Sequence, residues 1–292
     1  MKRLGVVVGP DTEISRRSFA ATNGAVYMNE EGHINIYPRE VSDPNIGCST
    51  ISLDRYTISH KLIEHCEPVV RGDCYEDPRL CKINDRFFLS CTQANLMITG
   101  EWKTDIVYGI SDNPFYFDLI KPDLPMPGNN KNGVFIPERI KGSYWLFHRV
   151  RPDICLAYST DLYQWHNLGS IMKPTNDYWQ SGHLGAGTPP IKTEEGWLEF
   201  YHATNPTARP YCMGACLLDL NDPTKVLART TDPLLFPEES YEINGWVTGG
   251  IIFPTGAIVL DNIYRIYYGA ADMYFAAAEF TRNEIFDKLK PI

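Results

Sequence analysis

The chain is poor in positive charge: its 292 residues include 27 Lys and Arg against 36 Asp and Glu, and the formal net charge is −9. The basic residues form no cluster, which argues against a nucleic-acid groove, since such a groove needs a stripe of Lys and Arg. Long apolar runs are missing as well. The first apolar stretch, LGVVVG (4–9), is too short for a signal-peptide core or a membrane span. We therefore expect neither nucleic acid nor a membrane as a partner.

Metal-binding motifs are also missing. The 8 cysteines show no CxxC spacing, and the 7 histidines form neither HxxxH nor HExxH. We therefore expect no bound metal and no organic cofactor. The cysteines lie in or near predicted strands, which favours buried, reduced thiols, and reduced thiols are typical of a cytoplasmic protein. The sequence thus predicts a cytoplasmic location.

The chain does contain one pattern five times. Each copy has a strand, a turn at Gly, Asp or Asn, and a second strand rich in aromatic residues, and the turns recur roughly every 50 to 65 residues. The copies are 25–39, 78–91, 136–149, 189–202 and 254–269. A second predicted hairpin follows each copy, at 47–62, 105–120, 154–169, 211–229 and 273–289.

Two hairpins give four strands, which is the size of one propeller blade. The repeats therefore predict an all-β fold, a five-bladed β-propeller, as a single domain over 1–292. A β-sandwich or jelly roll is the alternative, but neither requires a fivefold repeat. In a propeller the innermost strands line a central channel, so polar residues near the ends of the repeated strands are candidate site residues. They are Asn23, Arg39, 76–79, Lys131, Asn132, Glu138, His148, Arg149, His183, 185–187, His202, Tyr211 and Asp272.

The segment YEDPRL (75–80) concentrates two carboxylates beside a proline and an arginine. A carboxylic acid in such a place protonates a leaving glycosidic oxygen if burial raises its pKa. The same residues also suit a simple turn, because Asp-Pro initiates turns and an Asp–Arg pair staples a loop. On these residues alone, the turn is the better interpretation.

Two further segments have the chemistry of an anion site. HLGAGTPPIK (183–192) brings small residues whose backbone N–H groups can approach an anion, although a tight crossover between blades needs the same glycines. His148–Arg149 and His202 end equivalent strands of neighbouring repeats. They suit a phosphate or a structural bridge equally well.

Together these segments resemble glycoside hydrolase family 130, the inverting β-mannoside phosphorylases and related β-mannosidases. The matching pieces follow the family order through nearly the whole chain: ATNGAV (21–26), YPRE (37–40), YEDPRL (75–80), 131–149, 183–202, 211–229 and 253–272. The family fold is a five-bladed propeller, which agrees with the repeats.

The resemblance implies that Asp77 is the catalytic acid and that it delivers its proton through a sugar hydroxyl. We expect the mannosyl unit to be bound by Asn23, Arg39, Arg79 and Asp272, and phosphate by Lys131, Asn132, His183, His202 and Tyr211. Family phosphorylases commonly carry Arg where Lys131 stands and Lys where His183 stands. Lys131 keeps the positive charge, whereas a histidine is only partly protonated at neutral pH.

The activity that the resemblance implies is inverting phosphorolysis of a β-linked mannoside (mannobiose, oligomannan or mannosyl-glucose) by inorganic phosphate, with release of α-mannose 1-phosphate. Phosphate is then a co-substrate and no protein base is needed. The alternative is an inverting β-mannosidase, which needs a base for water, with Glu138 or Glu242 as candidates. A second alternative is a carbohydrate-binding propeller without catalysis. A homo-oligomer is compatible with exposed sheet edges, but the sequence indicates no symmetry.

Overall fold

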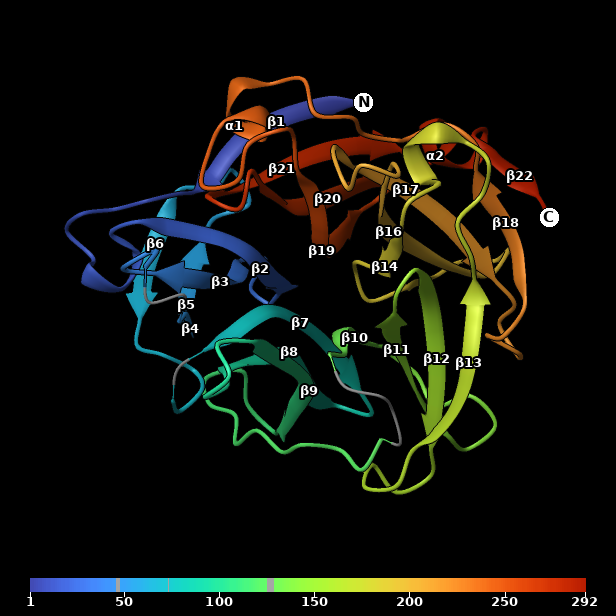
Figure 1. Ribbon diagram of the computed structural model, residues 1–292, viewed down its shortest axis with the longest axis horizontal. Coiled ribbons are helices and arrows are strands. Elements are labelled where there is room, and N and C mark those ends of the chain that lie inside the picture. Colours follow the sequence, from blue (N-terminus) through green and yellow to red (C-terminus); the bar gives the residue numbers. More distant parts are fainter. Residues whose placement is uncertain (46–47, 73, 125–128) are drawn as a thin grey trace.

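Five small sheets surround a central axis in the computed structural model of the protein (Figure 1). The structure describes residues 1–292 except 46–47, 73 and 125–128. The predicted five-bladed β-propeller is confirmed. In the first, second and fifth blades the repeated hairpin supplies the two inner strands. In the third blade the innermost strand, Lys131–Phe135, lies before the repeated segment, and in the fourth it begins before that segment, at Leu184. The aromatic second strand of each copy is buried between two neighbouring sheets.

The first three sheets follow the chain in order. The first is β2 (Ala20–Met28), β3 (Ile34–Val41), β5 (Leu53–Tyr56) and β6 (Leu62–Cys66), with β4 (Thr50–Ile51) beside β3. The second is β7 (Tyr75–Ile83), β8 (Arg86–Leu96) and β9 (Trp102–Ser111). The third is β10 (Lys131–Phe135), β11 (Tyr144–Val150), β12 (Asp153–Ser159) and β13 (His166–Met172).

The last two sheets share the chain ends. The fourth is β14 (Leu184–Ala186), β16 (Trp197–Thr204), β17 (Tyr211–Leu218), β18 (Val226–Thr230) and β22 (Leu289–Pro291), with β15 (Ile191–Lys192) beside β16. The fifth is β19 (Ile252–Leu260), β20 (Ile263–Ala270), β21 (Tyr274–Thr281) and β1 (Lys2–Val8). Short helices connect some strands: η1 (Ser15–Arg17), η2 (Tyr178–Gln180), α1 (Ser240–Ile243) and α2 (Arg282–Phe286).

The outer strands differ from the prediction in two blades. After β9 the segment up to residue 120 forms only an isolated bridge between Tyr108 and Ile120, so the second hairpin expected at 105–120 is incomplete. In the fifth blade the outer strand is the N-terminal β1, paired antiparallel with β21, and α2 follows where a strand was expected. This pairing joins the two ends of the chain and covers a sheet edge, which a local pattern does not reveal.

Hydrophobic clusters lie between the blades and close the ring. Phe200 and Ile266 belong to the cluster between the fourth and fifth sheets. Ile34 and Phe275 belong to the one between the first and fifth, where Val8 of the N-terminal strand also packs. Five such clusters cover the five blade interfaces. Because each sheet buries both faces against neighbours, the inner strands are held rigidly around the channel.

The inner strands of three successive blades each contain a β-bulge. The strand registers shift at 22–25, 76–79 and 131–134, in β2, β7 and β10. At each shift one residue takes a left-handed backbone conformation: Asn23 (φ 44°), Asp77 (φ 52°) and Asn132 (φ 60°). Non-glycine residues adopt this conformation rarely, and bulges beside active sites re-aim side chains.

Two searches of the described residues complete the survey of the fold. No helix in this part of the chain is both long and apolar enough to cross a membrane. Among the same residues, no group of three or more His, Cys, Asp or Glu is arranged to hold a metal ion.

Candidate active site

The bulged strands open into a cavity of about 270 Å³. Seven of the ten predicted site residues line it: Asn23, Arg39, Asp77, Lys131, Asn132, Tyr211 and Asp272. They come from all five blades or from the turns beside them, because each blade contributes only one or two side chains to the channel. The cavity is therefore a product of ring closure.

An amide joins two carboxylates on one wall of the cavity. Asn23 Nδ2 donates to Asp77 Oδ1 (2.9 Å) and to Asp272 Oδ1 (3.3 Å). Asn23 and Asp77 are buried and Asp272 is partly buried, so few water molecules screen the two carboxyl groups from each other. Asn23 thus fixes the relative position of the predicted acid and of a predicted mannosyl-binding residue.

Arg39 connects this wall to a second ion pair. Its guanidinium donates to Asp77 Oδ1 (3.4 Å) and Glu76 Oε1 (2.9 Å). The other oxygen of Glu76 accepts from Lys131 Nζ (2.7 Å). Lys131 is predicted to bind phosphate, but its positive charge is already largely neutralised by the Glu76 carboxylate.

The pKa values of the two carboxyl groups are displaced in opposite directions. Burial raises the pKa of Asp77, but Arg39, Arg79 and Lys131, with the hydrogen bond from Asn23, outweigh it and leave the pKa below its ordinary value. The condition stated for acid catalysis, a pKa raised by burial, is therefore not met by these residues alone. For Asp272, burial prevails, and the neighbouring charge of Asp77 adds to it, so its pKa is raised.

Three arginines of the cavity lining have no carboxylate partner among the described residues. Arg149, Arg151 and Arg209 line the cavity, and none of them forms an ion pair with a described residue. Arg149 is only 8% exposed. Burial, together with the positive charge of Arg151, lowers the pKa of Arg149 to about 10, so the side chain remains charged at neutral pH.

Two predicted phosphate ligands, His183 and His202, do not line the cavity but contact residues that do. His202 Nε2 lies 3.3 Å from Asn132 Nδ2, and His183 Nε2 lies 3.1 Å from the Tyr211 hydroxyl. Burial and then Arg149 lower the pKa of both imidazoles, that of His183 to about 3. Both are therefore neutral at pH 7. Gly185 allows this packing, since a Cβ there would lie 2.3 Å from Asn132 Nδ2.

Arg79, predicted to bind the mannosyl unit, does not line the cavity. Its guanidinium donates to the backbone oxygens of Asp77 (2.7 Å) and Gly187 (3.0 Å) and lies over the Phe253 ring. These contacts hold the bulge of β7 against the fourth blade. The position favours a role in orienting Asp77.

The two candidate bases for hydrolysis lie outside the cavity. Glu138 is exposed and pairs with Lys192. Glu242 is fully buried in α1, where its carboxylate accepts from Arg3 and from the Tyr268 hydroxyl. Among the described residues, the carboxylates that line the cavity are Glu76, Asp77 and Asp272. Neither candidate base is placed to activate a water molecule there.

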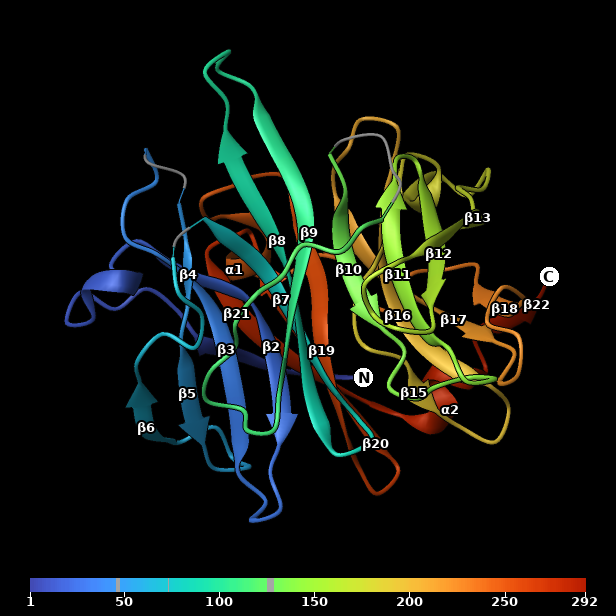
Figure 2. The same cartoon turned by 90° about the horizontal axis from the view of Figure 1, so that it is seen from below.

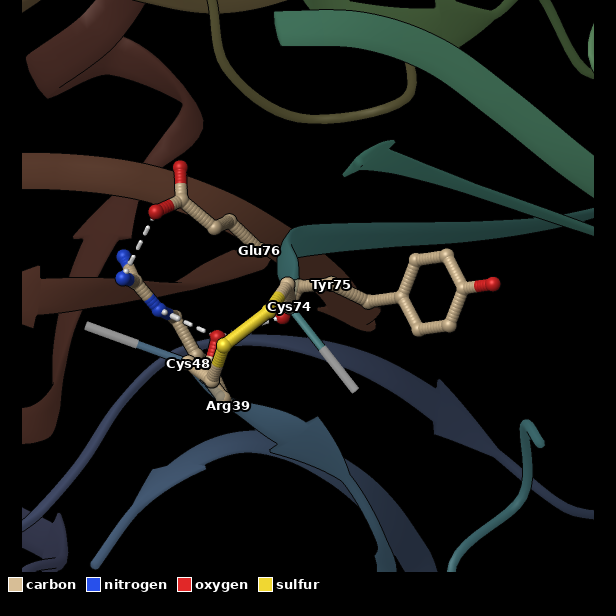
Figure 3. The surroundings of a disulfide bond; sticks show 6 residues. Arg39, Cys48, Cys74, Tyr75 and Glu76 are labelled. Atoms are coloured by element: carbon tan, nitrogen blue, oxygen red, sulfur yellow. Dashed lines mark hydrogen bonds and ion pairs between the residues drawn. A yellow bond between two sulfur atoms is a disulfide. The ribbon is translucent and has the colours of Figure 1, made fainter. Parts of the chain in front are cut away.

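A disulfide lies beside the Arg39–Glu76 ion pair. Cys48 and Cys74 are bonded, so the expectation of reduced thiols is wrong for these two; the other six are free. Figure 3 shows the bond next to the Arg39–Glu76 ion pair. The bond joins the segment before β4 to the start of β7, two segments that only the fold brings together. The cytoplasmic location stays a prediction.

The site contains two arginines, Arg151 and Arg209, that did not stand among the sequence candidates, whereas Arg149 was a candidate for phosphate. A signal was present: Arg151 and Arg209 each precede a proline, and a strand begins directly after that proline. Side chains alternate along a strand, so Arg149 lines the cavity while His148 turns to Asn167 of its own blade.

Comparisons with known proteins agree on one family. The family model described as beta-1,4-mannooligosaccharide phosphorylase matches residues 1–291. A 1,2-beta-oligomannan phosphorylase of Thermoanaerobacter sp. (strain X514) is 34% identical over 82% of this chain and 77% of its own. A beta-1,2-mannobiose phosphorylase of the same organism is 38% identical over 72% of this chain and 68% of its own.

A solved structure agrees with the geometry. The Listeria innocua beta-1,2-mannobiose phosphorylase, in complex with beta-1,2-mannobiose, superimposes with a TM-score of 0.77. It is 26% identical, and the match covers 92% of each chain. The similarity therefore extends through all five blades.

Proposed function

This chain belongs to glycoside hydrolase family 130, a family of mannoside phosphorylases, and from that membership we propose that it phosphorolyses β-linked mannooligosaccharides with inversion. Asp77 is the general acid. Asn23, Arg39 and Asp272 bind the mannosyl unit. The product is α-mannose 1-phosphate, and the acceptor-side sugar leaves with its hydroxyl restored.

The observation that carries this proposal is that one cavity holds buried carboxylates together with three arginines that have no carboxylate partner among the described residues. Arg149 is buried, whereas Arg209 is partly buried and Arg151 is exposed. A buried cation without a partner, such as Arg149, is costly for a folded protein unless an anion completes it. A phosphate between Arg149, Arg151 and Arg209 supplies that anion and is at the same time the nucleophile.

Phosphate binding also prepares the acid. In the ligand-free protein, the cations around Asp77 keep its carboxyl ionised. A bound phosphate adds negative charge to the cavity and offsets these cations, so the pKa of Asp77 rises and it takes up a proton. A phosphate oxygen then bonds to the anomeric carbon, the glycosidic C–O bond breaks on the opposite face, and the proton of Asp77 reaches the leaving oxygen through a sugar hydroxyl.

Replacement of the acid tests this mechanism. Asp77→Asn keeps an oxygen for Asn23 and Arg39 but cannot give a proton, so kcat is expected to fall by about 10²–10⁴-fold. The measurement is α-mannose 1-phosphate released from β-1,2-mannobiose, β-1,4-mannobiose and 4-O-β-mannosyl-glucose. Asp112→Asn, at an exposed ion pair with Arg86, is the matched control and should keep full activity.

Omission of phosphate separates the alternatives. Phosphorolysis stops without phosphate, whereas an inverting mannosidase releases mannose at the same rate. A carbohydrate-binding propeller shows no turnover in either condition. Full activity of Asp77→Asn, in a protein that melts like the wild type, would contradict the role given to Asp77.

A further inference from the structure

Two clefts open from the central cavity, and one exposed tryptophan lines both. The larger, about 680 Å³, shares Lys131, Arg149 and Arg151 with the cavity. The smaller, about 340 Å³, shares Arg39, Glu76 and Trp246. Trp102 lines both clefts but not the cavity itself. It therefore stands at the mouth, where a substrate that extends out of the cavity must pass.

Trp102 is held on a rigid element. It is the first residue of β9, in the β8–β9 hairpin that extends beyond the neighbouring strands in Figure 2. Two residues farther on, the Thr104 backbone nitrogen donates to Asn129 Oδ1 (3.1 Å), and its carbonyl accepts from the Asn130 nitrogen (3.0 Å). These bonds tie the hairpin to the segment before β10. The indole is 42% exposed, which is unusual for so large an apolar side chain on a fixed strand.

A second tryptophan forms another wall of the smaller cleft. Trp246 contacts the Phe19 ring edge-on at 5.4 Å, and the Arg39 guanidinium lies 5.9 Å from its centre. Glu76 and Asn45 line the same cleft. Aromatic faces next to amide and carboxylate oxygens match a sugar ring, which has an apolar face and a rim of hydroxyl groups.

We infer that Trp102 is the platform for the second sugar on the acceptor side of the cleaved bond, and that it makes the protein prefer chains of three or more sugars to disaccharides. This inference rests on the proposed function. The central cavity, at about 270 Å³, lies just below the usual range of ligand sites, about 300–1,000 Å³, so a longer chain extends into the clefts. A disaccharide ends before it reaches Trp102.

The test is the ratio of kcat/KM for a trisaccharide to that for a disaccharide, measured with β-1,2- and β-1,4-linked mannosides. Trp102→Ala is expected to lower the ratio about tenfold, which corresponds to about 1.4 kcal/mol, and to leave the disaccharide value within about twofold. Trp102→Phe keeps an aromatic face and should restore part of the ratio. Leu96→Ala, at the residue paired with Trp102 across the hairpin, is the matched control and should leave the ratio unchanged.

A binding measurement distinguishes a failure of this inference from a failure of the proposed function. Calorimetric titration of Asp77→Asn with the same sugars needs no turnover. Tighter binding of the trisaccharide, lost when Trp102→Ala is added, supports the platform even if no phosphorolysis occurs. Equal affinity for both lengths, or a Trp102→Ala ratio equal to that of the wild type, overturns it.

Discussion

Arg149 provides a quantitative test of the anion site. Its pKa is lowered from 12.5 to about 10 by burial, and at 1.36 kcal/mol per pH unit this difference corresponds to about 3 kcal/mol. Because the folded-state pKa is the lower one, the charged side chain destabilises the ligand-free fold fully below pH 10. The penalty declines only as the pH rises toward 12.5. At pH 7 it is present in full.

Arg149→Met removes the charge and keeps an apolar side chain of similar length. Without phosphate, the variant is expected to gain up to about 3 kcal/mol in free energy of unfolding, which raises the melting temperature by up to about 6–12 °C at roughly 2–4 °C per kcal/mol. The KM for phosphate should rise about 10- to 150-fold, since a hydrogen bond to a charged group contributes about 1.5–3 kcal/mol.

Thermal melts with and without phosphate provide the decisive assay. Phosphate at 100 times the wild-type Kd stabilises the wild type by about 2.7 kcal/mol, and a roughly 10- to 150-fold weaker affinity should reduce this gain to about 0.3–1.4 kcal/mol in Arg149→Met. Arg86→Met, at the exposed Arg86–Asp112 pair, is the control for loss of an arginine. A variant that melts below the wild type and keeps the wild-type phosphate KM would refute the reasoning.

Two further predictions concern stability. Burial raises the pKa of Glu199 to about 8, so its neutral form favours the fold below about pH 4.5 and this contribution is lost as the pH rises through 8. Glu199→Gln should therefore raise the free energy of unfolding by up to about 5 kcal/mol at pH 9 and change it little at pH 4. Urea titrations at both pH values measure this difference, and an equal effect of the substitution at both would contradict the prediction. The disulfide closes a segment with a sequence separation of 26, so its loss in Cys48→Ser/Cys74→Ser should cost about 3 kcal/mol. It should also raise the mannoside KM, because Ser49 and Tyr75, next to the bond, hold Arg39; unchanged urea titrations and kinetics count against both effects.

The blades were predictable because their pattern is local. Each repeated hairpin has its turn and its aromatic strand within about 15 residues, so periodicity reveals it. The partner of β21 was not predictable, since β1 lies at the other end of the chain and its pairing depends on ring closure. The Cys48–Cys74 bond escaped for the same reason.

The site residues at the strand bulges could also be identified from the sequence, whereas their charge states could not. Asn23, Asp77 and Asn132 stand at equivalent points of their repeats, each followed by Gly or Pro. Whether Asp77 is neutral or ionised depends on Arg39 and Lys131, which lie on other strands. The position of Arg79 could not be predicted from the sequence, because it depends on a hydrogen bond to the Gly187 backbone oxygen, which lies two blades away.

The order of residues along the chain determined the number of blades and the kinds of side chain near the channel, since strand alternation and turn chemistry act over a few positions. Only the closed ring decided which of those side chains meet. It placed Arg149, Arg151 and Arg209 around one cavity, without ion-pair partners among the described residues, and buried Glu242 elsewhere. The reason is physical: burial and electrostatic neighbours, which set the charge of each group, are properties of contacts between blades.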